Sequence, residues 1–370
     1  MEYILILFFL NFGIYILYLL INIFSLFSYS PFKIYQPTTC PVSIIIAVRN
    51  GEKSLPRLIQ SLLSQDYKGH FEIIIVDDQS EDNTKNIIKD YQKKDERIVY
   101  SCSDEGDRKL RFKKKALDAG IKKSKNDILL FTDVDCVIGN SWISTMASCF
   151  NEKVDYVIGF SRAEHHHGTA NLFQRIDFLM MFFSVIAFTN IGFPLASSGQ
   201  NQAFKKQLFK KVGGYTKISN LLMGDDSIFL QLCVRKKANV VFCNNIKSYV
   251  FCRPEIKWKN LLLQKMRWAG DGRIMWKYNY IFYQIMLSAV LSNLLIFLLF
   301  YFNYYQQLIL VIILKFIAEY TFCYSGRIHT FEKISIFDFI YWFIIHIPYI
   351  CIMCIASFFV PLIQWKNRKQ

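Results

Sequence analysis

Apolar and polar residues alternate in regular blocks along the middle of the chain. Short apolar runs of strand type end in polar residues, and between them lie stretches whose apolar positions recur at helical spacing. The strand-like runs are 42–50, 71–80 and 127–135, and the helical stretches are 54–65, 82–94 and 113–125. Strands that alternate with helices in this way predict an α/β fold, in which helices cover both faces of a mixed, mainly parallel sheet.

Much longer apolar runs lie at the two ends of the chain. Residues 3–27 contain no Lys or Arg, and at about 1.5 Å per helical residue they are long enough to cross a bilayer core of about 30 Å. They lack the basic start and the small-residue cleavage site of a signal peptide, so we expect a retained membrane helix over residues 1–27. Three more apolar runs, 281–302, 308–324 and 339–363, predict two to three C-terminal membrane helices.

Polar residues inside the last two runs affect how these runs cross a membrane. Lys315 and Glu319 are costly in lipid unless they pair or turn inward, and only one helical turn separates them, which makes mutual pairing possible. His346 and Pro348 leave open whether the third run is kinked, re-entrant or interfacial.

The charge of the chain is concentrated between the membrane runs. The chain has 44 Lys and Arg against 29 Asp and Glu, which gives a formal net charge of +15. Lys33 follows the first apolar run, and a series of basic residues from Lys257 to Lys277 precedes the second. By the positive-inside rule, this distribution predicts a cytoplasmic domain over residues 28–280. Residues 281–370 are then C-terminal helices and a basic tail, whose charge favours an even number of C-terminal crossings.

The composition argues against two other classes of protein. The ten cysteines show no disulfide spacing, as expected for a domain in a reducing compartment. The basic residues are not accompanied by a nucleic-acid-binding motif, and four apolar runs are not typical of a nucleic-acid-binding protein. We therefore expect a membrane, but no nucleic acid, among the partners of this protein.

Charged residues gather where the predicted strands end. Arg49 lies at the end of the first strand-like run, Asp77 and Asp78 in the second, and Asp133 and Asp135 in the third. Because ligands of parallel α/β sheets bind beyond the carboxyl ends of the strands, we expect these residues to build a nucleotide site. Asp77 and Asp78 have a second interpretation, as caps of the helix that follows them.

Asp133 and Asp135 form a D-x-D pair. In an extended segment, alternation points both side chains to the same side, where their oxygens suit Mg²⁺ or Mn²⁺ held together with a diphosphate. Such a cation stabilises the negative charge of a departing diphosphate. The pattern is short enough to occur by chance, so an ordinary polar strand end is the alternative.

Two further charged segments add candidate residues. The stretch "RKLRFKKKAL", residues 108–117, contains Lys113, the lysine best suited to contact a phosphate. Its alternatives are a solvated helix start and a surface that faces anionic lipid. The stretch "GDDS" carries Asp225 and Asp226, adjacent carboxylates that raise one another's pKa. Either one suits a general base that takes a proton from an acceptor hydroxyl, and the alternative is a helix cap.

The stretch "QKMRW", residues 264–268, is the most specific of the short patterns. On a helix, Gln264 and Arg267 share a face. Arg267 is suited to bind a phosphate, and Trp268 offers a stacking surface to a sugar or an acceptor. By contrast, the three consecutive histidines of "EHHHG", residues 164–168, cannot easily face one metal ion. We expect a surface loop there, with acceptor contact as the alternative.

Taken in order, these segments resemble the family 2 inverting glycosyltransferases, which have a GT-A nucleotide-sugar domain of Rossmann-like type. The matching pieces are "PVSIIIAVRNGEKSLPRLIQSLLSQDY", "EIIIVDDQSEDNT", "KKKALDAGI", "DILLFTDVDC", "SGQNQAFKKQLFKKVGGY", "GDDSIFL" and "QKMRW". The resemblance implies that Asp77 and Asp78 bind the nucleoside and that Asp133 and Asp135 bind a metal diphosphate. It also implies that Asp225 or Asp226 is the base, and we favour Asp226, although this pair departs from the family's usual Glu-Asp.

The Q-x-x-R-W motif and the flanking helices look like the membrane-bound branch of that family, which includes ceramide glucosyltransferases and the synthases of chitin, cellulose and hyaluronan. The resemblance implies transfer of a sugar from a nucleotide sugar, with a UDP-sugar favoured, to a lipid or glycan acceptor, and we favour a lipid or lipid-linked one. One helix before the domain and at most three after it are few for a polymer channel, so a processive polysaccharide synthase is the alternative. A non-catalytic membrane scaffold that retains the fold is an alternative of another class.

Overall fold

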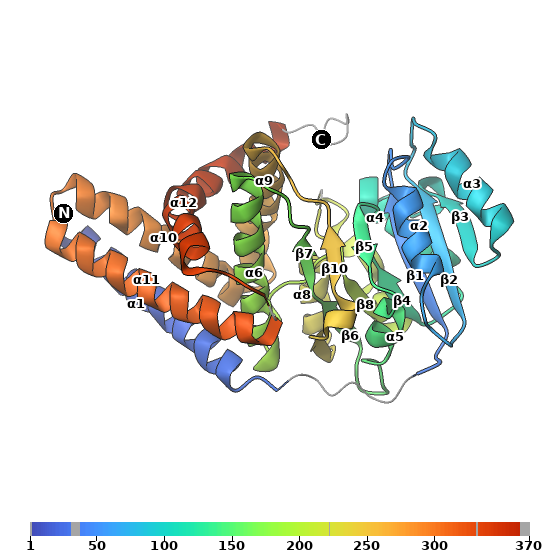
Figure 1. Ribbon diagram of the computed structural model, residues 1–370, viewed down its shortest axis with the longest axis horizontal. Coiled ribbons are helices and arrows are strands. Elements are labelled where there is room, and N and C mark those ends of the chain that lie inside the picture. The colour runs from blue at the N-terminus through green and yellow to red at the C-terminus, as the bar shows by residue number, and fades with distance from the viewer. Residues whose placement is uncertain (1, 31–37, 222, 331, 363–370) are drawn as a thin grey trace. The chain divides into compact units, whose positions relative to one another are not determined.

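The chain folds into two compact units, shown together in Figure 1. The computed structural model describes residues 2–30, 38–221, 223–330 and 332–362. The sheet unit consists of Ser30–Glu164 and Ala196–Arg253, and the helical unit consists of Met1–Tyr29, His165–Leu195 and Pro254–Gln370. Each unit therefore combines segments that are distant in the sequence.

A seven-stranded sheet lies at the centre of the sheet unit, in the order β3-β2-β1-β4-β8-β6-β9. Its strands are β1 (Val42–Val48), β2 (Phe71–Asp77), β3 (Ile98–Cys102), β4 (Ile128–Phe131), β6 (Tyr156–Gly159), β8 (Gln202–Lys205) and β9 (Val240–Cys243). The pairs β1–β2, β1–β4, β2–β3 and β6–β9 are parallel, whereas β8 runs antiparallel to β4 and β6. The prediction of a mixed, mainly parallel sheet with helices is confirmed.

The helices of the sheet unit follow the predicted apolar spacing. They are α2 (Leu55–Leu63), α3 (Thr84–Lys94), α4 (Phe112–Lys123), α5 (Trp142–Ala147), α7 (Lys206–Val212) and α8 (Ser227–Arg235), with 3-10 turns η1 (Ser103–Glu105), η2 (Gly214–Ile218) and η3 (Ile246–Ser248). Helix α4 packs against β1 and β2. A second, three-stranded sheet consists of β5 (Cys136–Ile138), β10 (Val250–Cys252) and β7 (Ser161–Ala163).

The helical unit contains the apolar ends of the chain. Its helices are α1 (Glu2–Phe27), α6 (Thr169–Asn190), α9 (Trp258–Ile274), α10 (Tyr280–Tyr301), α11 (Tyr305–Thr330) and α12 (Ile336–Ala356), with 3-10 turns η4 (Met275–Lys277) and η5 (Ser357–Leu362). Figure 1 shows α1 running beside α10 and α11, with which it packs. The predicted N-terminal and C-terminal apolar helices are thus present.

Five of the described helices, α1, α6, α10, α11 and α12, are long and apolar enough to cross a membrane. Helix α6, which includes Arg175 and Asp177, was not predicted from the sequence as one of them. In α6, 78% of the apolar window is buried inside the protein, against 22–33% in the other four helices. Helix α6 is therefore largely covered by protein.

Lys315 and Glu319, for which the sequence made pairing possible, do pair in the structure. Both side chains are fully buried in the helical unit, and the Lys315 ammonium forms an ion pair with the Glu319 carboxylate. The hydroxyl of Tyr15, on α1, donates a hydrogen bond to the same carboxylate oxygen. The pair thus links α11 to α1 and offsets part of the cost of two charges inside an apolar bundle.

Candidate active site

Parallel pairing places the ends of β1 and β2 side by side. Val48 is in register with Asp77, and the backbone N–H of Asp78 donates to the Val48 carbonyl over 2.7 Å. The Arg49 side chain, which is 6% exposed, donates to the carbonyl oxygens of Asp78 (3.2 Å) and Gln79 (2.5 Å). Arg49 therefore connects the loops that follow the two strands and fixes the edge of the sheet where a nucleotide was expected.

The residue at the N-cap position of the helix that follows, α3, is Asn83 rather than either aspartate at this edge. A carboxylate oxygen of Asp77 accepts from the Ser80 N–H over 3.1 Å, which closes a turn. The Thr84 N–H, in the first turn of α3, donates to Oδ1 of Asp82 over 3.0 Å. Asp77 and Asp78 are both nearly buried, so the loop holds them in place at the strand end.

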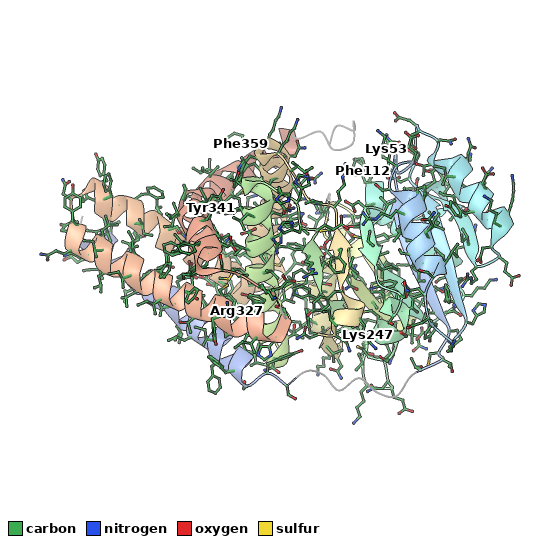
Figure 2. The ribbon with its side chains drawn as sticks, in the orientation of Figure 1. Lys53, Phe112, Lys247, Arg327, Tyr341 and Phe359 are labelled. Carbon is green, nitrogen blue, oxygen red and sulfur yellow. The ribbon has the colours of Figure 1, made fainter. Side chains whose placement is uncertain are left out.

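The backbone is strained at three positions around this edge. Asn50, Gln79 and Phe112 have φ angles of 50°, 56° and 53°, in the left-handed region that non-glycine residues rarely adopt. Asn50 follows β1, Gln79 follows β2, and Phe112 begins α4. Figure 2 shows Phe112 toward the same end of the sheet unit as Lys53, a residue of the loop after β1. Lys247 lies toward the other end. Strained residues of this kind gather at functional sites, where the surrounding structure maintains them.

Lys113 connects two of the predicted acidic segments. Its ammonium lies 2.8 Å from Asp133 Oδ1 and 3.0 Å from Asp225 Oδ2. Burial opposes the charge of the ammonium, but the neighbouring carboxylates Asp133, Asp225 and Asp226 hold the pKa of Lys113 well above its usual value. The first turn of α4, the loop after β4 and the turn before α8 therefore meet at one cationic side chain.

Asp226 is held by two backbone N–H groups. Its Oδ1 accepts from the Ser227 N–H (2.5 Å), so that it caps α8, and its Oδ2 accepts from the Gly199 N–H (3.2 Å). Burial, followed by the charge of Asp225, raises the pKa of Asp226 to about 6, although Lys113 and the two N–H groups oppose this rise. A carboxylate with this pKa is largely ionised at neutral pH and is still basic enough to accept a proton.

The segment "SSGQNQ", residues 197–202, lies against these acids. The Ser197 N–H donates to Ser227 Oγ (3.2 Å), and the Ser227 hydroxyl donates to the Ser197 carbonyl (2.9 Å). A Cβ atom on Gly199 would lie 2.9 Å from Lys113 Nζ and 3.3 Å from Asp225 Oδ2. Glycine is therefore needed at position 199 for this segment to approach the charged cluster so closely.

The D-x-D segment departs from its expected geometry. We expected an extended segment with both carboxylates on one side, but residues 134–135 form a turn in which the Cys136 N–H donates to the Asp133 carbonyl (3.1 Å). Strand alternation therefore does not place the side chains of Asp133 and Asp135 on one side. Asp133 is partly buried beside Lys113, whereas Asp135 is exposed, and its carbonyl accepts from the Arg253 N–H over 3.3 Å.

The two carboxylates at this turn suit a cation that takes its remaining ligands from a diphosphate and water. Among the described residues, no three His, Cys, Asp or Glu side chains are grouped so as to hold a metal ion. Mg²⁺ and Mn²⁺ take oxygen ligands, and Mg²⁺ commonly uses one or two carboxylates, completing its shell with phosphates and water. Asp133 and Asp135 therefore fit an ion that is held jointly with a diphosphate, and they do not fit a cage made by protein alone.

Gln264, Arg267 and Trp268 lie on α9, in the helical unit. Gln174 Nε2 donates to Gln264 Oε1 over 3.3 Å, and the Trp268 ring stacks on Phe178 with the ring centres 5.7 Å apart. Lys265, which lies inside the same motif, was not assigned a role from the sequence. Its ammonium is buried, forms an ion pair with Asp177 of α6 and lies 4.5 Å from the centre of the Trp268 ring.

The histidines of "EHHHG" are exposed, as expected for a surface loop. Two other residues of the sheet unit were not singled out from the sequence. Gly199 was recognised only as part of a longer segment, and Lys114 belonged to a basic cluster that resembled a solvated helix start. The sequence alone does not show the role of Gly199. A glycine between polar residues indicates a close backbone approach only when the segment that it approaches is known.

Two family profiles match the chain. Residues 43–213 match "Glycosyl transferase family 2", and residues 143–355, more than half of the chain, match "Glycosyl transferase family group 2". The chain belongs to the family 2 glycosyltransferases. It is therefore a glycosyltransferase, and the cluster around Lys113 is its candidate active site.

Individual proteins resemble this glycosyltransferase to different extents. It is 25% identical to glycosyltransferase AglE of Haloferax volcanii over 241 residues, which are 63% of this chain and 73% of that protein. It is 30% identical over 118 residues to the GalNAc(5)-diNAcBac-PP-undecaprenol beta-1,3-glucosyltransferase of Campylobacter jejuni. That match covers 32% of this chain and only 37% of the Campylobacter enzyme.

One solved structure resembles the chain over its whole length. It is the mannosyltransferase PcManGT from Pyrobaculum calidifontis in complex with GDP-Man and Mn²⁺, which superposes with a TM-score of 0.61. The match covers 99% of both chains at 16% sequence identity. The fold of this glycosyltransferase, including the helices outside the sheet unit, is therefore a fold already known in this class of enzyme.

Proposed function

We propose that this glycosyltransferase is membrane-bound and inverting, and that it moves a sugar from a nucleotide sugar to a hydroxyl of a lipid or lipid-linked acceptor. The observation that carries the proposal is the meeting of Lys113, Asp133 and Asp225 at one point of the sheet unit, next to Asp226. Five apolar helices in the described residues support the membrane location. The name of the relative from Campylobacter jejuni includes PP-undecaprenol, and this supports a lipid-linked acceptor.

Asp226 is our candidate for the general base. Its pKa of about 6 leaves it mainly ionised at neutral pH, and it is less buried than Asp225, whose carboxylate lies against Lys113. In the proposed step, Asp226 takes the proton of the acceptor hydroxyl while the acceptor oxygen bonds to the anomeric carbon. The bond from that carbon to the diphosphate oxygen breaks, and the nucleoside diphosphate leaves with the bonding electrons.

The remaining predicted residues would bind the donor. Asp77 and Asp78 would accept hydrogen bonds from the nucleoside, with Arg49 holding their loop, and Lys113 would contact the diphosphate. Asp133 and Asp135 would hold Mg²⁺ or Mn²⁺, which when bound stabilises the charge of the departing diphosphate. Gln264, Arg267 and Trp268 would contact the diphosphate and the acceptor. We favour a UDP-sugar as donor, and GDP-mannose is the main competitor because PcManGT is in complex with it.

A panel of radiolabelled nucleotide sugars tests this proposal. Membranes that contain the full chain would receive each donor with Mg²⁺ or Mn²⁺ and then be extracted with organic solvent. We expect label in the solvent from one donor, and its loss in Asp226→Asn but not in Asp90→Asn, an exposed residue on α3. Label retained as insoluble polymer would favour the processive synthase, and absence of transfer from every donor would favour the scaffold.

A further inference from the structure

Lys114 is a buried lysine directly beside the candidate active site. It follows Lys113 on α4, but its side chain is only 1% exposed. Its ammonium donates to the carbonyl oxygens of Ile218 (2.6 Å) and Met223 (3.1 Å), and also to that of Leu221. All of these residues belong to the sheet unit. Lys114 therefore binds the chain that follows η2, which we call the 218–223 segment; its residue Leu222 lies outside the described residues.

The chemistry of these contacts is specific to an ammonium group. A lysine ammonium has three N–H donors and no acceptor, and three carbonyl oxygens match its donors. Burying a charge without such partners is costly, and hydrogen bonds that involve a charged group are stronger than neutral ones. A residue of similar length without donors would leave the three carbonyls without this partner. The position therefore holds a lysine for its hydrogen bonds rather than for solubility.

The 218–223 segment leads directly into the two candidate acids. Gly224 has a φ angle of +96°, and Asp225 and Asp226 follow it at the start of α8. A Cβ on Gly224 would meet Ile228 at 3.0 Å, so the backbone turns tightly here. The Met223 carbonyl that Lys114 binds thus lies only two residues before Asp225.

Consecutive residues of α4 thus hold one loop at two points. Lys113 contacts the side chain of Asp225, and Lys114 contacts the backbone that precedes it. We propose that Lys114 is a positioning residue, whose ammonium binds the 218–223 segment to α4 and thereby sets the place of Asp225 and Asp226 relative to Lys113. The consequence for catalysis rests on the proposed function, whereas the contact itself does not.

Hydrogen–deuterium exchange of the full chain tests the contact without requiring activity. In Lys114→Met, we expect backbone amides of residues 218–226 to exchange at least about tenfold faster than in the wild type, because local opening becomes easier. Lys115→Met is the matched control, since Lys115 is the next residue of α4 and its ammonium forms an ion pair with the exposed Asp104. Lys114→Gln, which keeps an amide donor, is the milder variant and should change in the same direction.

Kinetics with the donor identified by the panel test the positioning role. In Lys114→Met we expect kcat to fall by about a hundredfold while KM for the donor stays within about twofold, because small misplacements of a base affect the reacting geometry more than donor binding. A general loss of structure would change both constants. Unchanged exchange in 218–226, or an equal fall of kcat in Lys115→Met, would overturn the proposal. Absence of transfer by the wild type would instead count against the proposed function.

Discussion

The ammonium of Lys113 lies 3.0 Å from Oδ2 of Asp225, although α4 and the turn before α8 are far apart in the sequence. The same ammonium lies 2.8 Å from Asp133 Oδ1. One cation therefore balances two partly or fully buried carboxylates, and a third carboxylate, Asp226, feels its charge. The positions of the acids depend on this lysine, and the cluster and its neighbours lead to five predictions.

Replacing Lys113 by Met removes the cation and leaves Asp133 and Asp225 close to each other without it. We expect kcat/KM for the nucleotide sugar to fall by about a hundredfold or more, since a lost electrostatic contact of this kind typically costs that much. Steady-state transfer assays would measure it. Lys109→Met, an exposed residue of the same basic cluster, is the control. Activity of Lys113→Met within about twofold of the wild type would contradict a role in diphosphate binding.

The pH dependence of the reaction should report on Asp226. Because its pKa is raised to about 6, the carboxylate becomes protonated as the pH falls through this value and can no longer act as a base. We expect kcat/KM to fall by about tenfold per unit below pH 6, and Asp226→Asn to abolish transfer. A profile that stays flat down to pH 5 would contradict this assignment.

Protonation of Asp226, which should lower activity, should raise the thermal stability of the folded protein. The pKa of Asp226 in the folded protein, about 6, is above the ordinary aspartate pKa of 3.8, so the folded state takes up a proton as the pH falls from 6 toward 4. The wild type should therefore gain thermal stability relative to Asp226→Asn over this window and be at a disadvantage at pH 7. Thermal unfolding of the two proteins at pH 7 and pH 5 would measure the difference.

The fold class could be predicted because strands and helices of the middle block carry clear apolar spacing. Helix α2, for example, buries Leu55, Leu58, Ile59 and Leu62 on the face that the spacing indicates. Strand order could not be predicted, since the antiparallel insertion of β8 between β4 and β6 depends on pairing between distant segments. Strands β5, β7 and β10 have three residues each, too few to show a period.

The candidate site was predictable to the extent that it lies at strand ends. Asp77, Asp133 and Arg49 could be identified as candidates because parallel strands bring their carboxyl ends to one edge. The contacts of Lys114 were not predictable, since a lysine in a basic cluster has the same local pattern whether it is buried or solvated. The turn at residues 134–135 was also missed, because the strand ends at Phe131, earlier than the apolar run suggests.

Adding a methyl group at Gly199 should damage the site directly. In Gly199→Ala the new Cβ would lie 2.9 Å from Lys113 Nζ, and either the lysine or the 197–202 segment must move. We expect kcat to fall by about tenfold to a hundredfold, as is typical when catalytic groups shift by about 1 Å. Gly139→Ala is the control, because its Cβ would meet only the Lys247 carbonyl, at 3.7 Å. Equal activities of the two variants would contradict the close approach.

Removal of divalent metal tests the D-x-D turn. We expect EDTA to abolish transfer and Mg²⁺ or Mn²⁺ to restore it, because Asp133 and Asp135 supply two oxygen ligands and the diphosphate supplies the others. In Asp135→Ala, the metal concentration needed for half-maximal activity should rise by at least about tenfold, whereas the exposed Asp90→Ala should behave as the wild type. Because Asp135 is exposed, its replacement should change the thermal unfolding temperature by less than about 2 °C. Full activity of Asp135→Ala in the presence of EDTA would show that the acids do not act through a metal, and would leave Lys113 as the group that balances the diphosphate.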